Sequence, residues 1–357
     1  MNTLHLDYTF RCIGYSTLEQ SAQNTNLLVL FVAAQLSWTN QEAMSFLGAM
    51  LEVATIGDSE KLESISGEMI SAVQSHILKT SIDLSSLQGV KPDACALTIT
   101  NSDKREQLLQ ILILLPYIDM KVDPAMIQLV DSFAAALDFN SNTLKDLHRV
   151  RDNKMNILLI DYGRRGVEQV LGIDTAPKAL KAVIKIIHEA TGDPILASKF
   201  QGLERYPVDS LGHSVYHWYR DRKWPLPGEK KCTPDLLLTH DCCHILSGCN
   251  TDFRGEMDVS GFQAGMLSDE DMGFEQLLEV ILDFHLGKKF TTVGDIVPPK
   301  TGNFEPEEVL TSYERGVSCN INLFEDWEFW DVAEQPVVEL RKRYGIPEIS
   351  GPILLKP

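Results

Sequence analysis

Apolar residues recur at helical spacing along most of this 357-residue chain, and no stretch alternates apolar and polar side chains as a strand would. Residues 59–79 show the pattern clearly. Their apolar positions are Leu62, Ile65, Met69, Ile70, Val73 and Ile77. Most connections between such segments are short, which suits antiparallel helices. The sequence therefore predicts an all-α fold, with a helical bundle in its first half.

Caps and breaks divide this pattern into elements. Thr39-Asn40 opens one helix and Pro124 takes the first position of another, whereas residues 80–103, rich in Ser, Thr and Asp, are predicted to be a loop. The polar stretch 149–154 predicts a boundary, with domains at 1–152 and 153–357. The predicted helices cover a segment from Asn26, then 41–55, 59–79, 104–117, 124–137, a segment ending near 152, then 155–170, 177–190, 193–200, an aromatic helix after Gly212, 234–247, 274–287, 304–315 and 327–344.

The most concentrated chemical signal is a pair of histidines, His240 and His244, with Asp241 between them and Glu256 further along. On a helix, the two histidines lie about 40° apart and Asp241 about 100° from the first, so the three side chains share one side. The turn-rich segment 247–252 ends the helix and lets the chain return to present Glu256. Two imidazoles with one or two carboxylates are a ligand set for Zn²⁺, Fe²⁺ or Mn²⁺. Taken alone, two histidines on a helix are more often surface or core residues than metal ligands.

Other residues near the motif have weaker functional interpretations. The thiols of Cys242, Cys243 and Cys249 are candidate ligands, but small buried residues that pack the helix are the simpler interpretation. Phe262, Gln263 and Met266 are candidate contacts for a lipid or substrate, with Gln263 facing a polar head. Apolar residues at such spacing are also typical of plain core.

The second half, over about 155–350, resembles the Coq-four family of ubiquinone (coenzyme Q) biosynthesis proteins. The family's metal signature is histidine-aspartate, two residues, histidine, eleven residues, glutamate, and every position of it is present here. Two departures are the segment 233–239, where the family has an Arg-rich stretch, and the additional N-terminal helical domain. The landmarks that carry the resemblance are His240, Asp241, His244, Glu256, the segment 207–212, the segment 255–259 and the segment 340–346.

The resemblance implies an all-α domain that binds a prenyl lipid in an apolar cavity beside a metal ion. It also implies oxidative decarboxylation of the quinone head-group precursor and organisation of a biosynthetic complex. His240 and His244 would be nitrogen ligands and Glu256 an oxygen ligand, while Asp241 would be a fourth ligand or would orient an imidazole. Zinc is the expected ion, with iron as the alternative.

Residues 104–150 resemble the TerB-like family of tellurite-resistance helical domains, through a helix, an acidic turn and a second helix. That resemblance implies a carboxylate metal site at Asp119 and Asp123. A cluster of carboxylates that caps a helix N-terminus is the simpler interpretation, because the helix dipole favours negative charge there.

Charge and cysteine content restrict the partners and the compartment. A formal charge of −18 without a basic stripe argues against nucleic-acid binding. Seven cysteines, an odd number, do not form a disulfide framework and indicate a reducing compartment. No signal or transit peptide is visible, and the apolar runs Leu27–Leu36 and Leu108–Ile118 are about half the length of a membrane span. We expect a soluble cytoplasmic protein with room for peripheral contact at the inner face of the membrane, where short basic runs such as Arg341–Arg343 would meet lipid headgroups.

Three functions are compatible with the sequence. The first is a metal-dependent protein of ubiquinone or prenylquinone biosynthesis that binds a prenylated aromatic precursor or isoprenoid lipid, with other biosynthetic enzymes as further partners. The second is a zinc hydrolase, because His-Asp-x-x-His resembles His-Glu-x-x-His with a shortened base. The third is a non-enzymatic lipid-binding scaffold. A homo-oligomer is expected in each case.

Overall fold

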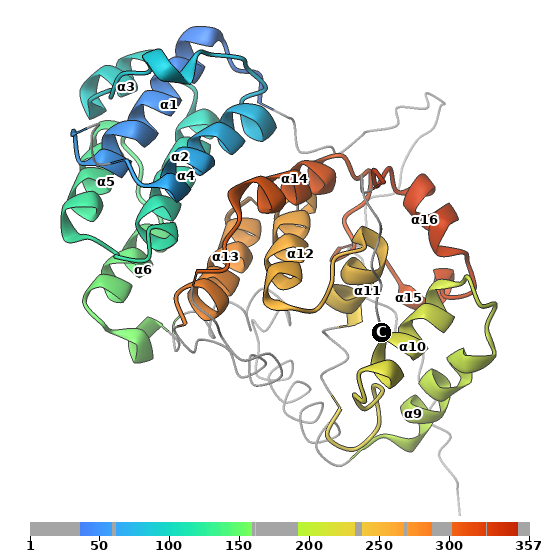
Figure 1. Cartoon of the computed structure of the whole chain (residues 1–357). Helices are drawn as coiled ribbons and strands as arrows, with labels where there is room; N and C mark the ends of the chain where they lie inside the picture. Colours follow the sequence, from blue (N-terminus) through green and yellow to red (C-terminus); the bar gives the residue numbers. More distant parts are fainter. Residues whose placement is uncertain are drawn as a thin grey trace, which may run out of the picture. The chain divides into compact units, whose positions relative to one another are not determined.

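The structure, a computed structural model, describes residues 36–58, 62–158, 161, 192–232, 238–267, 270–287, 302–325 and 327–348 (Figure 1). Within these ranges every regular element is a helix, and the one β-bridge joins Ser210 to Pro336. The all-α prediction is confirmed. None of the described helices is long and apolar enough to cross a membrane.

The first half forms a set of helices around a shared apolar core. The buried run Leu108–Ile118 lies in α4, so it is a core helix as its length indicated. Thr39 and Glu42 form a capping box that starts α1, and Asp123 caps α5 before Pro124. The elements are α1 (Asn40–Thr55), α2 (Ser64–Ala72), which continues into a π-helical turn, η2 (Val73–Ile77), then η3 (Leu84–Ser86), α3 (Pro92–Thr98), α4 (Ser102–Ile118), α5 (Pro124–Ala136) and α6 (Asn142–Arg151).

The second half is centred on α12, which packs against α11, α13 and α14 (Figure 1). Its other elements pack around the side of α11 that carries the cysteines. The elements are α9 (Pro194–Gln201), η4 (Gly202–Arg205), α10 (Leu211–Asp221), α11 (Leu238–Ser247), α12 (Phe253–Met266), α13 (Glu270–Val280), which continues into η6 (Ile281–His285), α14 (Pro306–Val317), α15 (Phe329–Val332) and α16 (Val337–Arg343).

Helices α12 and α14 approach each other so closely that glycines are required at their contact. A Cβ on Gly265 of α12 would lie 2.1 Å from the carbonyl oxygen of Tyr313. A Cβ on Gly316 of α14 would lie 2.0 Å from the carbonyl oxygen of Phe262. Any larger side chain at either position would separate the two backbones.

Contacts also join the two halves of the chain. The ring of His76 in η2 contacts the carboxylates of Glu307 (2.9 Å) and Glu314 (2.7 Å) in α14. The ring of His285 donates a hydrogen bond to the carbonyl of Ile118 at 2.9 Å. The domain boundary near residue 152 stays a prediction.

Three helix predictions differ from the structure. The predicted loop 80–103 contains η3 and α3, where Pro92 starts a helix after Lys91. The predicted helix 327–344 is two helices, because Pro336 lacks the N–H that a continuous helix would need there. Helix α12 was not predicted at all. The helix from Asn26, that at 177–190 and most of that at 155–170 lie outside the described residues.

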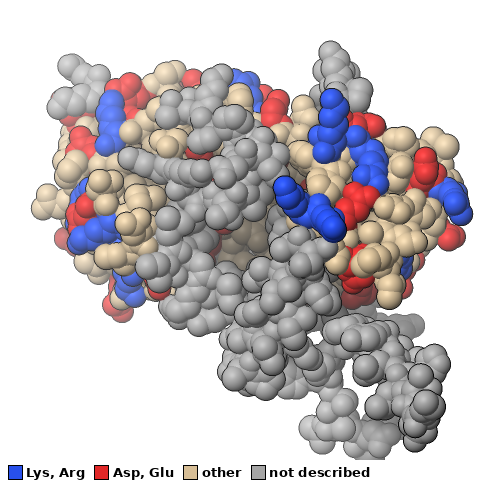
Figure 2. All heavy atoms as spheres, turned by 90° about the horizontal axis from the view of Figure 1, so that it is seen from below, with Lys and Arg blue, Asp and Glu red and all other residues tan. Residues whose placement is uncertain are grey.

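The face of the molecule shown in Figure 2 carries both signs of charge. Over its described parts, Lys and Arg side chains are interspersed with Asp and Glu. This mixture accords with a composition of 32 basic and 50 acidic residues.

Candidate metal centre

Two short helices place the predicted ligands. His240 and His244 lie one turn apart on α11, and Glu256 lies in the first turn of α12. Asp252 caps α12 by accepting the backbone N–H of Gly255 at 2.9 Å. A Cβ on Gly255 would lie 2.1 Å from the carbonyl oxygen of Asn250, so only glycine allows this sharp return. The Gly255-Glu256 pair thus turns the chain back toward α11.

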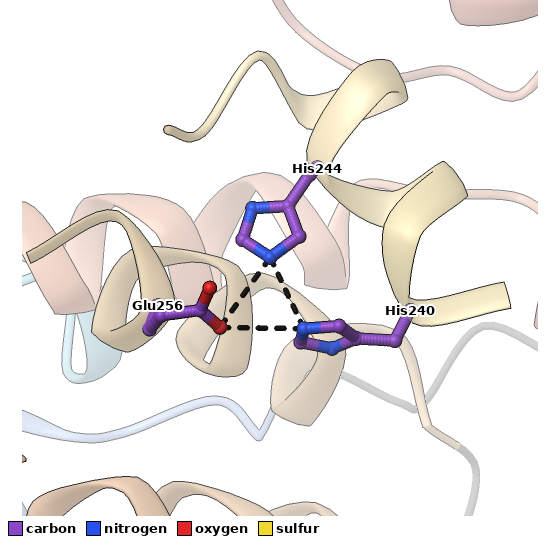
Figure 3. Close-up of side chains that lie close together, drawn as sticks. All are labelled: His240, His244 and Glu256. Carbon is purple, nitrogen blue, oxygen red and sulfur yellow. Dashed lines mark hydrogen bonds and ion pairs between the residues drawn. The ribbon is translucent and has the colours of Figure 1, made fainter. Parts of the chain in front are cut away.

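His240, His244 and Glu256 point their polar atoms at one another (Figure 3). The two Nε2 atoms are 3.1 Å apart, and Oε2 of Glu256 lies 3.3 Å from that of His240 and 3.4 Å from that of His244. Ligand atoms held about 2.1 Å from one ion are about 3.0 Å apart in an octahedral arrangement and about 3.4 Å apart in a tetrahedral one. The donors therefore have the spacing that a metal ion needs, and this group could hold one. Among the residues that the structure describes, no other group of three His, Cys, Asp or Glu side chains meets this condition.

The second nitrogen of each imidazole has its own partner. Nδ1 of His244 donates to the carbonyl oxygen of Cys249 at 3.3 Å, so Nε2 is the nitrogen directed at the centre. Nδ1 of His240 lies 2.8 Å from the side-chain nitrogen of Gln263, a buried residue of α12. Such outer contacts orient ligands and adjust metal affinity.

The charges of the three side chains support one another. Burial lowers the pKa of His240, but the hydrogen bond and charge of Glu256 outweigh it and raise this pKa to about 9. Burial raises the pKa of Glu256, but the two imidazoles outweigh it and hold this pKa well below its usual range. The side chain of His244 is 1% exposed, that of Glu256 16% and that of His240 26%. The centre is therefore open on the side of His240 and closed behind His244.

Asp241 lies outside this group of three. Its buried carboxylate accepts a short hydrogen bond from the hydroxyl of Tyr219 on α10. Burial raises the pKa of Asp241, and the charge of His240 opposes that rise. Both outer nitrogens of the histidines have other partners, so a role of Asp241 in the metal centre stays a prediction.

Two arginines hold the C-terminal end of α11. Arg341 donates to the carbonyls of Ile245 and Leu246, both at 2.8 Å, and Arg315 donates to that of Ser247 at 2.7 Å. These carbonyls have no partner within the helix. The arginines thereby fix the helix that carries both histidines.

A stacked pair of side chains lies against His244. The ring of Trp218 is 5.3 Å from that of His244, and the guanidinium of Arg222 lies over Trp218 at 3.7 Å. Burial lowers the pKa of Arg222, while the charges of Asp241 and Glu256 oppose that effect. This arginine therefore brings positive charge close to the centre.

An acidic face on α13 and η6 went unnoticed in the sequence. Glu275, Glu279 and Asp283 follow one another at intervals of four, and the first and last are buried. Burial and the charge of Asp283 raise the pKa of Glu279 to about 7, and the charge of His240 acts against them. Glu279 is thus close enough to His240 for their charges to interact. The spacing of four in an apolar helix is the signal that identifies this face.

The remaining candidates are buried side chains. Phe262 and Met266 belong to the core around α11, and their contact with a lipid stays a prediction. Cys242, Cys243 and Cys249 are buried free thiols and are not part of the three-ligand group. They fit the interpretation as packing residues.

The carboxylates of the TerB-like segment have structural partners. Asp123 accepts the backbone N–H of Ala125 at 2.7 Å and caps α5, as the simpler interpretation predicted. Asp119 lies at the C-terminal end of α4, 3.5 Å from the ammonium group of Lys121.

Comparison with known proteins gives a distant likeness. No family model matches the chain, and no curated protein matches it. Among solved structures, a protein from Nostoc punctiforme provisionally assigned to ubiquinone biosynthesis is similar, with 19% sequence identity. The match covers 66% of this chain and 97% of that chain, with a TM-score of 0.28. So loose a superposition supports no conclusion about activity. The TerB-like resemblance has no support from these comparisons.

Proposed function

We propose that this chain is a metal-dependent protein of prenylquinone biosynthesis, which binds a prenylated aromatic precursor beside a divalent ion. The observation that carries the proposal is the convergence of His240, His244 and Glu256 within 3.4 Å of one another. These are the positions that the Coq-four-like signature assigns to the metal. Zinc is the ion we favour, and iron is the alternative.

The residues would act mainly by holding and orienting. Two neutral imidazoles and one carboxylate leave positions free for the substrate, and the negative charge of Glu256 offsets part of the charge of the ion. A bound divalent ion would supply a Lewis acid beside the head group. The partly exposed side at His240 is where that head group would enter. The reaction proposed is oxidative decarboxylation. The carboxyl group leaves as carbon dioxide, one oxygen atom of dioxygen enters as the hydroxyl group, and a two-electron donor with two protons reduces the other oxygen atom to water.

The position of Asp241 argues against a zinc hydrolase. A general base must reach its water at about 3 Å. The carboxylate of Asp241 is instead buried and bonded to Tyr219. A role as a non-enzymatic lipid-binding scaffold remains the main competitor and is one outcome of the test below.

The test combines elemental analysis of the purified full-length protein with mass spectrometry of lipids that copurify with it. We expect about one zinc or iron ion per chain and a prenylated lipid. A stoichiometric metal with no lipid and with measurable peptidase activity would refute the proposal in favour of a hydrolase.

Two variants then separate enzyme from scaffold. His240→Ala should lose the metal and fail to restore quinone production in a strain that lacks this step. His217→Ala, which changes an exposed histidine of α10 with a 46% exposed side chain, should retain both properties. Rescue by a metal-free His240→Ala protein would show that the chain acts as a scaffold.

A further inference from the structure

The two histidines of the candidate metal centre are held in different ways. His244 donates from Nδ1 to a main-chain carbonyl, which can only accept a hydrogen bond. Its Nε2 is therefore the nitrogen that faces the centre. His240 instead meets the side-chain amide of Gln263, which has a donor at one end and an acceptor at the other.

The contact with Gln263 suits only one form of His240. An amide nitrogen facing Nδ1 suits the neutral ring that carries its hydrogen on Nε2, toward Glu256. The doubly protonated ring, which the charge of Glu256 favours, also carries a hydrogen on Nδ1 and needs an acceptor there. A ring that binds a metal ion through Nε2 must carry its hydrogen on Nδ1 and needs an acceptor there. Rotating the amide of Gln263 by half a turn brings its oxygen to that position.

The thiol of Cys243 is a second partner of this amide. Cys243 lies three residues after His240 on α11, and its side chain is hydrogen-bonded to Gln263. A thiol is a weak donor through S–H and a weak acceptor through sulfur. A buried amide needs such partners, and Gln263 is 3% exposed.

We propose that Gln263 is the positioning residue of His240, and that its amide oxygen accepts Nδ1–H when the centre holds a metal ion. The amide rotates so that its oxygen faces Nδ1 of His240 when this nitrogen carries a hydrogen, and its nitrogen faces Nδ1 when it does not. This inference rests on the proposed metal binding, but not on any reaction. It also gives Gln263 a role different from contact with a substrate head.

The test measures Zn²⁺ affinity by competition with a chromophoric chelator, using the full-length protein. Gln263→Leu removes the acceptor and should weaken Zn²⁺ binding about 10–100-fold. Gln263→Glu keeps an acceptor and should bind Zn²⁺ at least as tightly as the natural protein. Gln107→Leu is a matched control, because the side-chain oxygen of Gln107 in α4 is buried and has no hydrogen-bond partner among the described residues.

Thermal unfolding of the metal-free variants separates loss of fold from loss of positioning. The inference is overturned if Gln263→Leu binds Zn²⁺ as tightly as the natural protein. It is also overturned if Gln263→Leu and Gln263→Glu, both folded, lose Zn²⁺ affinity to the same extent. If the natural protein itself binds no Zn²⁺ or Fe²⁺, the proposed function fails, and this outcome is distinct from the other two. ¹⁵N NMR of His240 gives a second readout, with Nδ1 protonated and Nε2 bound in the zinc-loaded protein.

Discussion

Replacing Gly265 by alanine tests whether the close contact of α12 and α14 shapes the candidate metal centre. The new Cβ would lie 2.1 Å from the carbonyl oxygen of Tyr313 and 2.8 Å from the backbone nitrogen of Val317, whereas ordinary contacts begin at 3.4 Å. Both neighbours are backbone atoms, so no side-chain rotation can relieve the clash. The helices must separate by about 1 Å, an overpacking that costs about 1–3 kcal/mol or more.

Helix propensity acts in the opposite direction and must be included. Alanine stabilises a helix interior by about 0.5–1 kcal/mol relative to glycine. Gly67 of α2 isolates this effect, because the nearest atom to a Cβ there, in Leu62, is 3.7 Å away. We therefore expect Gly67→Ala to stabilise the protein by about 0.5–1 kcal/mol and Gly265→Ala to destabilise it by about 1–3 kcal/mol.

Urea unfolding followed by circular dichroism measures the difference between these two variants. The Zn²⁺ affinity of folded Gly265→Ala should also fall, because α12 carries both Glu256 and Gln263. The affinity of Gly67→Ala should not change. If Gly265→Ala unfolds at the same urea concentration as Gly67→Ala, the proposed crowding between α12 and α14 is refuted.

Three further predictions concern side chains around the centre. The pKa of His240 is about 9 in the fold against an ordinary 6.5, which stabilises the metal-free protein by about 3 kcal/mol below pH 6.5, and this contribution is lost as the pH rises through 9. Urea unfolding in the presence of a chelator, repeated across this pH range, should show the loss. If His240→Gln loses as much stability over the same pH range, the assignment to His240 is refuted. Tyr219→Phe removes the hydrogen bond of the buried Asp241 carboxylate and should lower the unfolding free energy at pH 7 by about 1–3 kcal/mol, and an unchanged urea midpoint would contradict this. Arg341→Met should lower the free energy of unfolding by about 2–3 kcal/mol, because two carbonyls of α11 lose a charged donor. Lys342→Met, at an exposed position of the same helix, should change it little. Equal urea midpoints for these two variants would exclude the anchoring role of Arg341.

The fold class and most helix positions were predictable because apolar periodicity and local caps act within one segment. The helix predicted at 124–137 is α5, which ends at Ala136, and the cap at Asp123 is formed by neighbouring residues. Helix α12 was missed because Gly255, Gly261 and Gly265 lower its intrinsic helix propensity. Its tight packing against α14, a contact with a distant segment, is what favours the helical form.

The convergence of His240, His244 and Glu256 was predictable from spacing, but the outer partners of the two histidines were not. His240 and His244 share a helix face, and Gly255 before Glu256 is a local turn signal. Gln263 was predicted as a candidate contact for a polar head, which stays a prediction, whereas its contact with His240 was not predicted. That contact depends on how α12 lies against α11, which no local pattern encodes.

The centre also forms a stable arrangement of charges without a metal ion, which has a consequence for binding. Glu256 lies in the first turn of α12 and His244 in the last turn of α11, where the helix dipoles favour negative and positive charge respectively. The Glu256 carboxylate also keeps His240 protonated up to a pKa of about 9. A metal ion must therefore displace a proton from His240 at neutral pH. Below pH 9, the metal affinity should increase about tenfold for each unit by which the pH is raised. The preformed spacing of the donors favours binding, whereas the proton opposes it, and the balance makes occupancy depend on pH.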